Sequence, residues 1–117
     1  MPAVGTDIVR ISRLSNLSSP AFLARSFTAA ELEICAGRSE SLAGRWAAKE
    51  AVMKALGAGV GEVALTDIDI AREESGRPVV RLSGTAAQRA RDVGQTGWDV
   101  SISHDGDYAI ATVVAWA

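Results

Sequence analysis

Residues 42–61 read LAGRWAAKEAVMKALGAGVG, and the spacing of their apolar side chains predicts a helix that ends at a glycine-rich loop. On a helical wheel at about 100° per residue, large apolar side chains form one stripe and small residues form a second, nearly opposite stripe. Because small residues let another backbone approach closely, we expect this helix to be buried on two sides. The large stripe comprises Leu42, Trp46, Met53 and Leu56, and the small stripe comprises Gly44, Ala48, Ala51 and Ala55.

The charged residues of this segment allow two interpretations. Glu50 and Lys54 lie four residues apart on one edge of the predicted helix, Arg45 lies on the other edge, and Lys49 falls within the large apolar stripe. An exposed Glu–Lys pair at this spacing contributes only about 0.2–0.5 kcal/mol. Alternatively, the charges line a cleft in which a carboxylate binds a hard cation and an ammonium binds phosphate oxygens. The glycine-rich loop that starts at Gly57 lets a ligand pass close to the backbone. It is only weak support for phosphate binding, because the familiar phosphate-binding loops precede a helix and this loop follows one.

Signals on both sides of this helix predict an α+β fold with a mainly antiparallel small sheet packed on helices. Strands are predicted over residues 2–9, 67–70, 79–82, 98–103 and 108–116. Helices are predicted to start at Ser19-Pro20, at Thr28 with a T-x-x-E capping box, at Ser41 and at Gly84. We expect one domain over residues 1–117.

Composition narrows the class of protein. The chain has 117 residues, of which 48% are hydrophobic and 22% are charged, as in globular proteins. Without an apolar run of about 18 residues or a secretory signal, no membrane association is expected. A net charge of −2 argues against general nucleic-acid binding. The single cysteine, Cys35, cannot form an internal disulfide, so the predicted compartment is the cytoplasm.

Scarce residue types mark further candidates. There are ten arginines but only two lysines, both in the central segment, and one histidine, His104. His104 is either a plain surface residue or an acid, base or phosphate ligand near neutral pH. Asp7 either caps the turn after its strand or supplies, with Glu50, a second carboxylate for Mg²⁺. Gly5 permits close backbone approach beside Asp7.

Three motifs together resemble the holo-acyl carrier protein synthase family, the small 4′-phosphopantetheinyl transferases. VGTDIVRISR (4–13) resembles the family's G-x-D block. FTAAEL (27–32), followed by the central segment, carries the W-x-x-K-E-A-x-x-K signature, and WDVSISHDGDYAIATVV (98–114) matches the S-x-S-H strand and last hairpin. The resemblance implies the phosphopantetheinyl transferase fold and a Mg²⁺-dependent enzyme of fatty acid biosynthesis. Such an enzyme transfers the 4′-phosphopantetheine arm of coenzyme A to a serine of apo-acyl carrier protein and releases adenosine 3′,5′-bisphosphate.

The resemblance also assigns roles to matching residues. Asp7 and Glu50 match the metal-binding carboxylates, and Lys54 matches the lysine that holds the pyrophosphate or the departing phosphate. The carrier serine gives its proton either to Glu50 or to a metal-bound water. The predicted catalytic residues are Glu50, Lys54 and His104, and the predicted coenzyme A contacts are Arg45, Lys49, Lys54, Gly57 and His104.

Basic residues near the start of the chain predict a docking surface for the carrier protein. Residues 8–30 contain Arg10, Arg13 and Arg25 and no acid, a charge of +3 that leaves −5 for the rest of the chain. This charge suits an acidic carrier, with Arg13 as the best single candidate. Three arginines in a serine-rich stretch are also compatible with an ordinary surface.

The small size of the chain has a consequence within this family. Larger relatives fold two such units in one chain and place the site between them, so the resemblance implies a homotrimer with sites between subunits. The apolar last strand and Trp116 are expected either at that contact or in the monomer core. Two other functions remain: a module that binds coenzyme A without transfer, and a structural scaffold. The joint presence of Asp7, Glu50 and Lys54 argues against the binding module, and a scaffold explains neither the Lys–Glu pairing nor the histidine.

Overall fold

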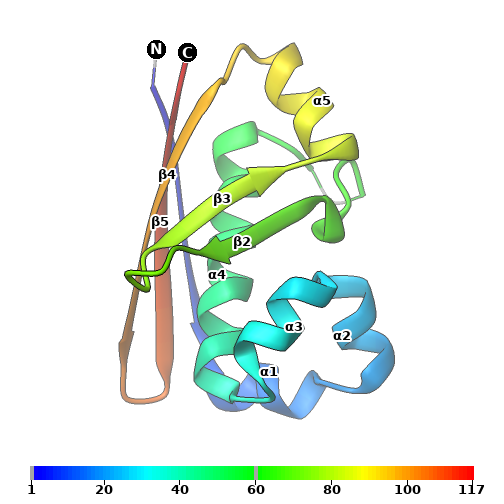
Figure 1. The fold of residues 1–117 in the computed structure, drawn as a ribbon, viewed down its shortest axis with the longest axis vertical. Helices are drawn as coiled ribbons and strands as arrows, with labels where there is room; N and C mark the ends of the chain where they lie inside the picture. Colours follow the sequence, from blue (N-terminus) through cyan, green and yellow to red (C-terminus); the bar gives the residue numbers. More distant parts are fainter. Residues whose placement is uncertain (1, 60) are drawn as a thin grey trace.

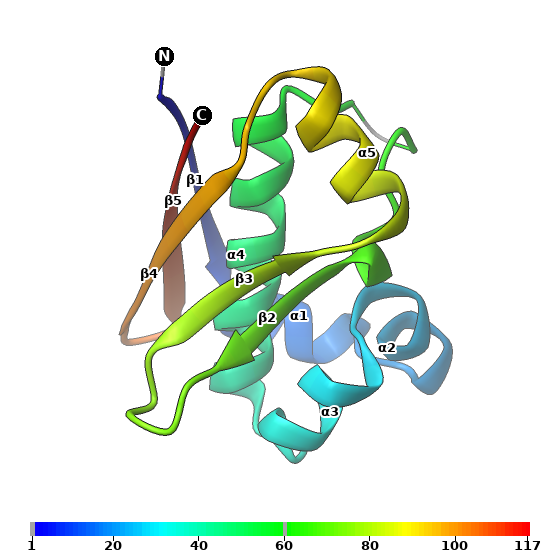
Figure 2. The ribbon, with the colours of Figure 1, turned by 45° about the horizontal axis from the view of Figure 1, so that its top comes forward.

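Helix α4 (Ser39–Leu56) lies between two layers of β-structure in the computed structural model, which describes residues 2–59 and 61–117 (Figures 1 and 2). One layer is an antiparallel sheet in the order β1-β5-β4, and the other is the antiparallel hairpin β2–β3. The strands are β1 (Ala3–Arg10), β2 (Ile68–Arg72), β3 (Pro78–Leu82), β4 (Gly97–Asp105) and β5 (Tyr108–Trp116). The shorter helices are α1 (Ile11–Leu17), α2 (Pro20–Ser26), α3 (Ala29–Cys35), the 3₁₀ turn η1 (Leu65–Asp67) and α5 (Gly84–Asp92).

The predicted α+β class and antiparallel pairing are confirmed, and so are most helix boundaries. Thr28 and Glu31 form the predicted capping box, with the Glu31 amide donating to Thr28 Oγ1 over 3.1 Å. Helix α4 begins two residues before the predicted Ser41 and ends, as predicted, at Gly57, whose φ of 64° is in the left-handed region. Val60 of the predicted glycine-rich loop lies outside the described residues. Across the described residues, no helix combines the length and apolar character that crossing a membrane requires.

The two apolar stripes of α4 pack on two sides of the helix, as the wheel predicts. The small stripe packs on the sheet, where a Cβ added to Gly44 would lie 2.9 Å from Ile102 Cγ2. Ala48 and Ala51 of the same stripe are fully buried. On the opposite side Trp46 packs against two aromatic rings of the α2–α3 region, Phe22 and Phe27, with centroids at 5.4 and 6.3 Å. Burial on both faces fixes the orientation of the charged residues that lie between them.

Gly5 sets the distance between β1 and α4. Along β1 the residues that face α4 are Gly5, Asp7 and Val9, because side chains alternate along a strand. A Cβ on Gly5 would overlap the Ala51 carbonyl oxygen and lie 2.9 Å from the Ala55 amide nitrogen. Only glycine therefore lets the strand lie directly on the helix, and this close packing holds Asp7 against the turn of α4 that carries Glu50.

Candidate active site

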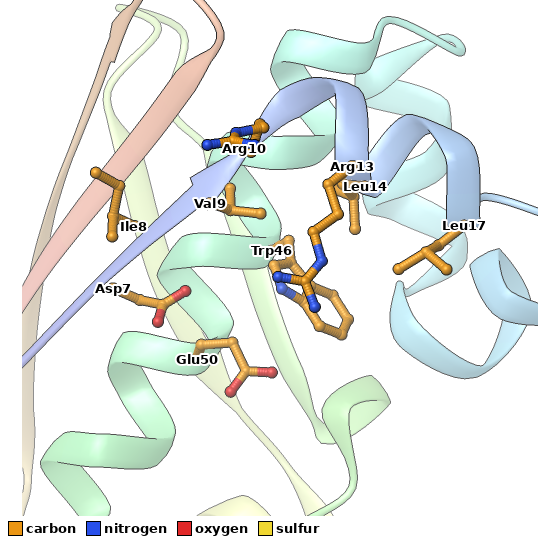
Figure 3. A pocket seen from close by; sticks show the side chains of 9 residues that line it. All are labelled: Asp7, Ile8, Val9, Arg10, Arg13, Leu14, Leu17, Trp46 and Glu50. Atoms are coloured by element: carbon orange, nitrogen blue, oxygen red, sulfur yellow. The ribbon is translucent and has the colours of Figure 1, made fainter.

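A cleft of about 300 Å³ opens between the end of β1, helix α1 and one edge of α4 (Figure 3). Asp7 and Glu50 point into it from separate elements, β1 and α4. Trp46 forms part of its wall, and Leu17 of α1 is exposed at its margin. Sequence reasoning placed Trp46 in the apolar stripe and gave Leu17 no role. The cleft is lined by Asp7, Ile8, Val9, Arg10, Arg13, Leu14, Leu17, Trp46 and Glu50.

Lys54 joins the two carboxylates into one electrostatic group. Its ammonium donates to Asp7 Oδ1 over 3.2 Å and to the Thr6 carbonyl over 2.8 Å. The lysine thus pairs across elements with β1 rather than with its helical neighbour. Burial raises the pKa of Glu50 above its ordinary value, and the nearby Asp7 raises it further, while Lys54 opposes the shift. A half-buried carboxylate beside a second carboxylate forms a site that favours a cation.

The donor set fits a hard cation such as Mg²⁺. Magnesium prefers oxygen ligands, keeps several waters, and is commonly held by one or two carboxylates plus substrate phosphates. Asp7 and Glu50 supply such a pair, and Lys54 stands beside them as a compact cation for phosphate oxygens. Among the described residues, no group of three or more His, Cys, Asp or Glu side chains is placed to enclose a metal.

Two of the three predicted docking arginines lie in the same cleft. Arg13 extends from α1 into it (Figure 3). Arg10 is held at its rim by Tyr108, with Arg10 Nη2 donating to the phenol oxygen over 3.0 Å and the guanidinium 5.6 Å from the ring centroid. Arg25 lies in the last turn of α2, is exposed, and does not line this cleft in the described part of the chain.

Lys49 and Arg45 do not line this cleft in the described part of the chain, so their role as coenzyme A contacts stays a prediction. The Lys49 ammonium is fully buried, 2.7 Å from Glu31 Oε1, and donates to the Leu65 carbonyl over 2.8 Å and to the Ile68 carbonyl. Arg45 is 9% exposed, and its Nε donates to the Ile70 carbonyl over 3.2 Å. Both cations therefore connect α4 to η1 and β2 from inside the protein. The position of Lys49 within the large apolar stripe was the sequence signal for this.

His104 and Gly57 also lie away from the carboxylates within one chain. His104 Nε2 is 3.0 Å from the Glu40 carbonyl, in the first turn of α4. Glu50 follows ten residues later, roughly 15 Å along the helix axis. Gly57 ends α4, and its carbonyl accepts a hydrogen bond from Arg89 Nη2 over 3.0 Å. A single subunit therefore brings together Asp7, Glu50, Lys54, Arg10 and Arg13, but not the remaining predicted residues.

Comparison with known proteins identifies the family. Residues 3–113 match the family model of the 4′-phosphopantetheinyl transferase superfamily. The holo-[acyl-carrier-protein] synthase of Moorella thermoacetica is 49% identical, and the alignment covers 97% of this chain and 93% of that protein. The holo-[acyl-carrier-protein] synthase of Herpetosiphon aurantiacus is 44% identical, and the alignment covers 97% of this chain and 98% of that protein. The crystal structure of the Helicobacter pylori holo-[acyl-carrier-protein] synthase in complex with coenzyme A superposes with a TM-score of 0.88 at 35% identity, covering 97% of this chain and 99% of that one. The chain therefore belongs to the 4′-phosphopantetheinyl transferase superfamily.

Proposed function

We propose that the chain is a holo-acyl carrier protein synthase that acts in fatty acid biosynthesis in the cytoplasm. The hydroxyl oxygen of a carrier serine forms a new bond to the phosphorus next to the pantetheine arm of coenzyme A. The pyrophosphate P–O bond on the nucleotide side breaks, adenosine 3′,5′-bisphosphate leaves, and the serine proton passes to an acceptor in the cleft. The observation that carries this proposal is the meeting of Asp7, Glu50 and Lys54 in a chain so similar to enzymes of that name.

The proposed roles follow from the charges of these side chains. Asp7 and Glu50 would hold Mg²⁺, which supplies charge neutralisation to the pyrophosphate when it is bound. Lys54 is 56% exposed at the mouth of the site, so its ammonium can reach phosphate oxygens. In phosphoryl transfer the protein mainly positions the reacting groups and stabilises developing charge. The fixed spacing between β1 and α4 serves both tasks because it holds the carboxylates together before substrate binds.

A homotrimer is supported by an exposed apolar face of the sheet. β5 is the central strand of the sheet, yet its residues that point away from α4 are exposed. The residues of β1 that point away from α4 are exposed as well. Val4 is registered opposite Val114, and Ile8 opposite Ile110, so the apolar side chains form pairs across the strands. Extended exposed apolar patches mark interaction surfaces. The face comprises Val4, Ile8, Tyr108, Ile110, Val114 and Trp116.

Charge placed on this face is expected to dissociate the oligomer. We expect Val114→Glu to shift the sedimentation coefficient from that of a trimer to that of a monomer, because a buried unpaired carboxylate is strongly unfavourable at an interface. Val93→Glu on the α5 side is the matched control, because Val93 is 40% exposed and Val114 is 39% exposed. If both variants sediment like the unmodified chain, this face is not the contact.

Carrier docking at the arginine-lined end of the cleft gives a second prediction. We expect Arg13→Glu to raise the KM for apo-acyl carrier protein about tenfold, and more at low salt, because reversing a charge converts steering into repulsion. The KM for coenzyme A should stay unchanged. Arg25→Glu carries the same charge change outside the cleft and should have a smaller effect. Equal KM values for the two variants would mean that net charge, and not Arg13, directs docking.

The proposed activity is tested by incubating the protein with coenzyme A, Mg²⁺ and an apo-acyl carrier protein, and then measuring the mass of the carrier. A gain equal to the phosphopantetheine arm is expected, and omission of Mg²⁺ should abolish it. The alternative of a module that binds coenzyme A without transfer predicts saturable coenzyme A binding by calorimetry with no mass gain on any carrier.

A further inference from the structure

Helix α1 begins without a cap of its own. Arg10 stands at its N-cap position and gives no side-chain hydrogen bond to the helix, and within the described residues its first turn holds no acidic residue. The first amide groups of a helix need acceptors from outside the helix. Here they come from the β4–β5 turn at the other end of the sequence. The Ile11 amide donates to the Asp107 carbonyl over 2.7 Å, and the Ser12 amide donates to Asp107 Oδ1 over 3.0 Å.

Asp107 holds the side chain of Ser12 as well as its backbone. Ser12 Oγ donates to Asp107 Oδ2 over 2.5 Å, so both carboxylate oxygens are engaged by one residue of α1. The next residue in the chain, Tyr108, binds the Arg10 guanidinium. Two consecutive residues of the hairpin thus fix the junction of β1 and α1. The carboxylate also lies where the helix dipole favours a negative charge.

We propose that Asp107 is a positioning residue for carrier docking, a role that rests on the proposed function. Helix α1 has only seven residues, and helices this short are marginal without outside support. It carries Arg13 and Leu17 to the cleft. The proposed metal ligands Asp7 and Glu50 stand on other elements, β1 and α4. Loss of the Asp107 cap therefore loosens the docking helix and leaves the carboxylate pair in place.

Kinetics separate this role from a general structural one. We expect Asp107→Ala to raise the KM for apo-acyl carrier protein about fivefold, the usual scale for loss of a helix cap. The KM for coenzyme A and the turnover at saturating carrier should stay within about twofold. The KM of Asp107→Asn for apo-acyl carrier protein should lie between the values of the unmodified chain and of Asp107→Ala, because asparagine keeps an acceptor oxygen but loses the charge. Asp105→Ala is the matched control, an exposed aspartate beside the same turn that gives α1 no hydrogen bond in the described part of the chain.

Amide hydrogen exchange of the protein alone provides a readout that does not depend on catalysis. The Ser12 amide should exchange about fivefold faster in Asp107→Ala than in the unmodified chain, while amides of α4 keep their rates. An unchanged Ser12 rate would overturn the cap itself. Faster exchange with an unchanged carrier KM would overturn the docking role. If the unmodified chain transfers nothing to any carrier, the proposed function and the docking role fail together, and the exchange rates still decide whether Asp107 caps α1.

Discussion

Glu50→Gln is expected to reduce transfer to the carrier at least about a hundredfold while leaving the fold intact. A neutral amide oxygen is a poor ligand for a hard cation, and the variant leaves Asp7 as the single carboxylate of the pair. The loss should appear in turnover measured at saturating coenzyme A and carrier. Mg²⁺ titrated into the protein with coenzyme A present, without carrier, should give heat for the unmodified chain and much less for the variant.

Stability should move in the opposite direction from activity in this variant. The pKa of Glu50 is raised in the folded protein, so the folded state binds the proton more tightly than the unfolded state does. The free energy of unfolding therefore falls as pH rises from the ordinary glutamate pKa through the raised value. Glutamine removes this penalty, so the thermal midpoint at pH 7 should equal or exceed that of the unmodified chain. Glu33→Gln, at an exposed site on α3, is the control and should change neither property.

Such a gain in stability with a loss of turnover would identify Glu50 as a residue kept for function. Full activity in Glu50→Gln would show that Glu50 is not a ligand, and a large fall in the thermal midpoint would show that its carboxylate mainly supports the fold. Either result would remove the central argument for the proposed metal site.

Local signals in the sequence were sufficient for most of the fold. The two stripes of α4, the Thr28–Glu31 capping box and the stop at Gly57 each involve residues within a few turns of one another, so chain order alone reveals them. Helix α1 was not predicted as a separate helix, because its cap comes from Asp107, at the far end of the chain. A helix whose amide groups are satisfied through tertiary contacts carries no start signal in its own sequence.

The site was predictable to the extent that its residues lie on regular elements. Asp7 and Glu50 were expected together from the family resemblance, and Gly5 supplied a physical reason for the approach of β1 to α4. Residue type and motif position did not reveal the burial of Lys49 and Arg45, because whether a cation faces solvent or the interior depends on which segment covers it. His104 lies beside the first turn of α4, and its separation from Glu50 follows from the strand pairing of the last hairpin and not from a local motif.

Lys49→Met is expected to lower the free energy of unfolding by about 3–5 kcal/mol, the usual range when one partner of a buried ion pair is removed. The Lys49 ammonium and the Glu31 carboxylate are both fully buried, 2.7 Å apart. Glu31 also accepts from the Thr28 and Ile70 amides over 2.8 Å each, so it links α3 to β2. Burial lowers the pKa of Lys49, and Glu31 opposes that shift, so the charge of the lysine depends on its partner. Urea unfolding followed by circular dichroism measures the loss.

The second lysine of the helix provides the matched control. Lys54→Met removes the same charge five residues further along, where the side chain is 56% exposed, so stability should change by less than about 1 kcal/mol while transfer falls sharply. Lys49→Met should show the reverse pattern, a large loss of stability with an unchanged KM for coenzyme A in the folded fraction. Combining Lys49→Met with Glu31→Gln should restore part of the stability, because no uncompensated charge then stays buried. Unchanged stability in Lys49→Met together with a raised KM for coenzyme A would instead return Lys49 to the substrate site.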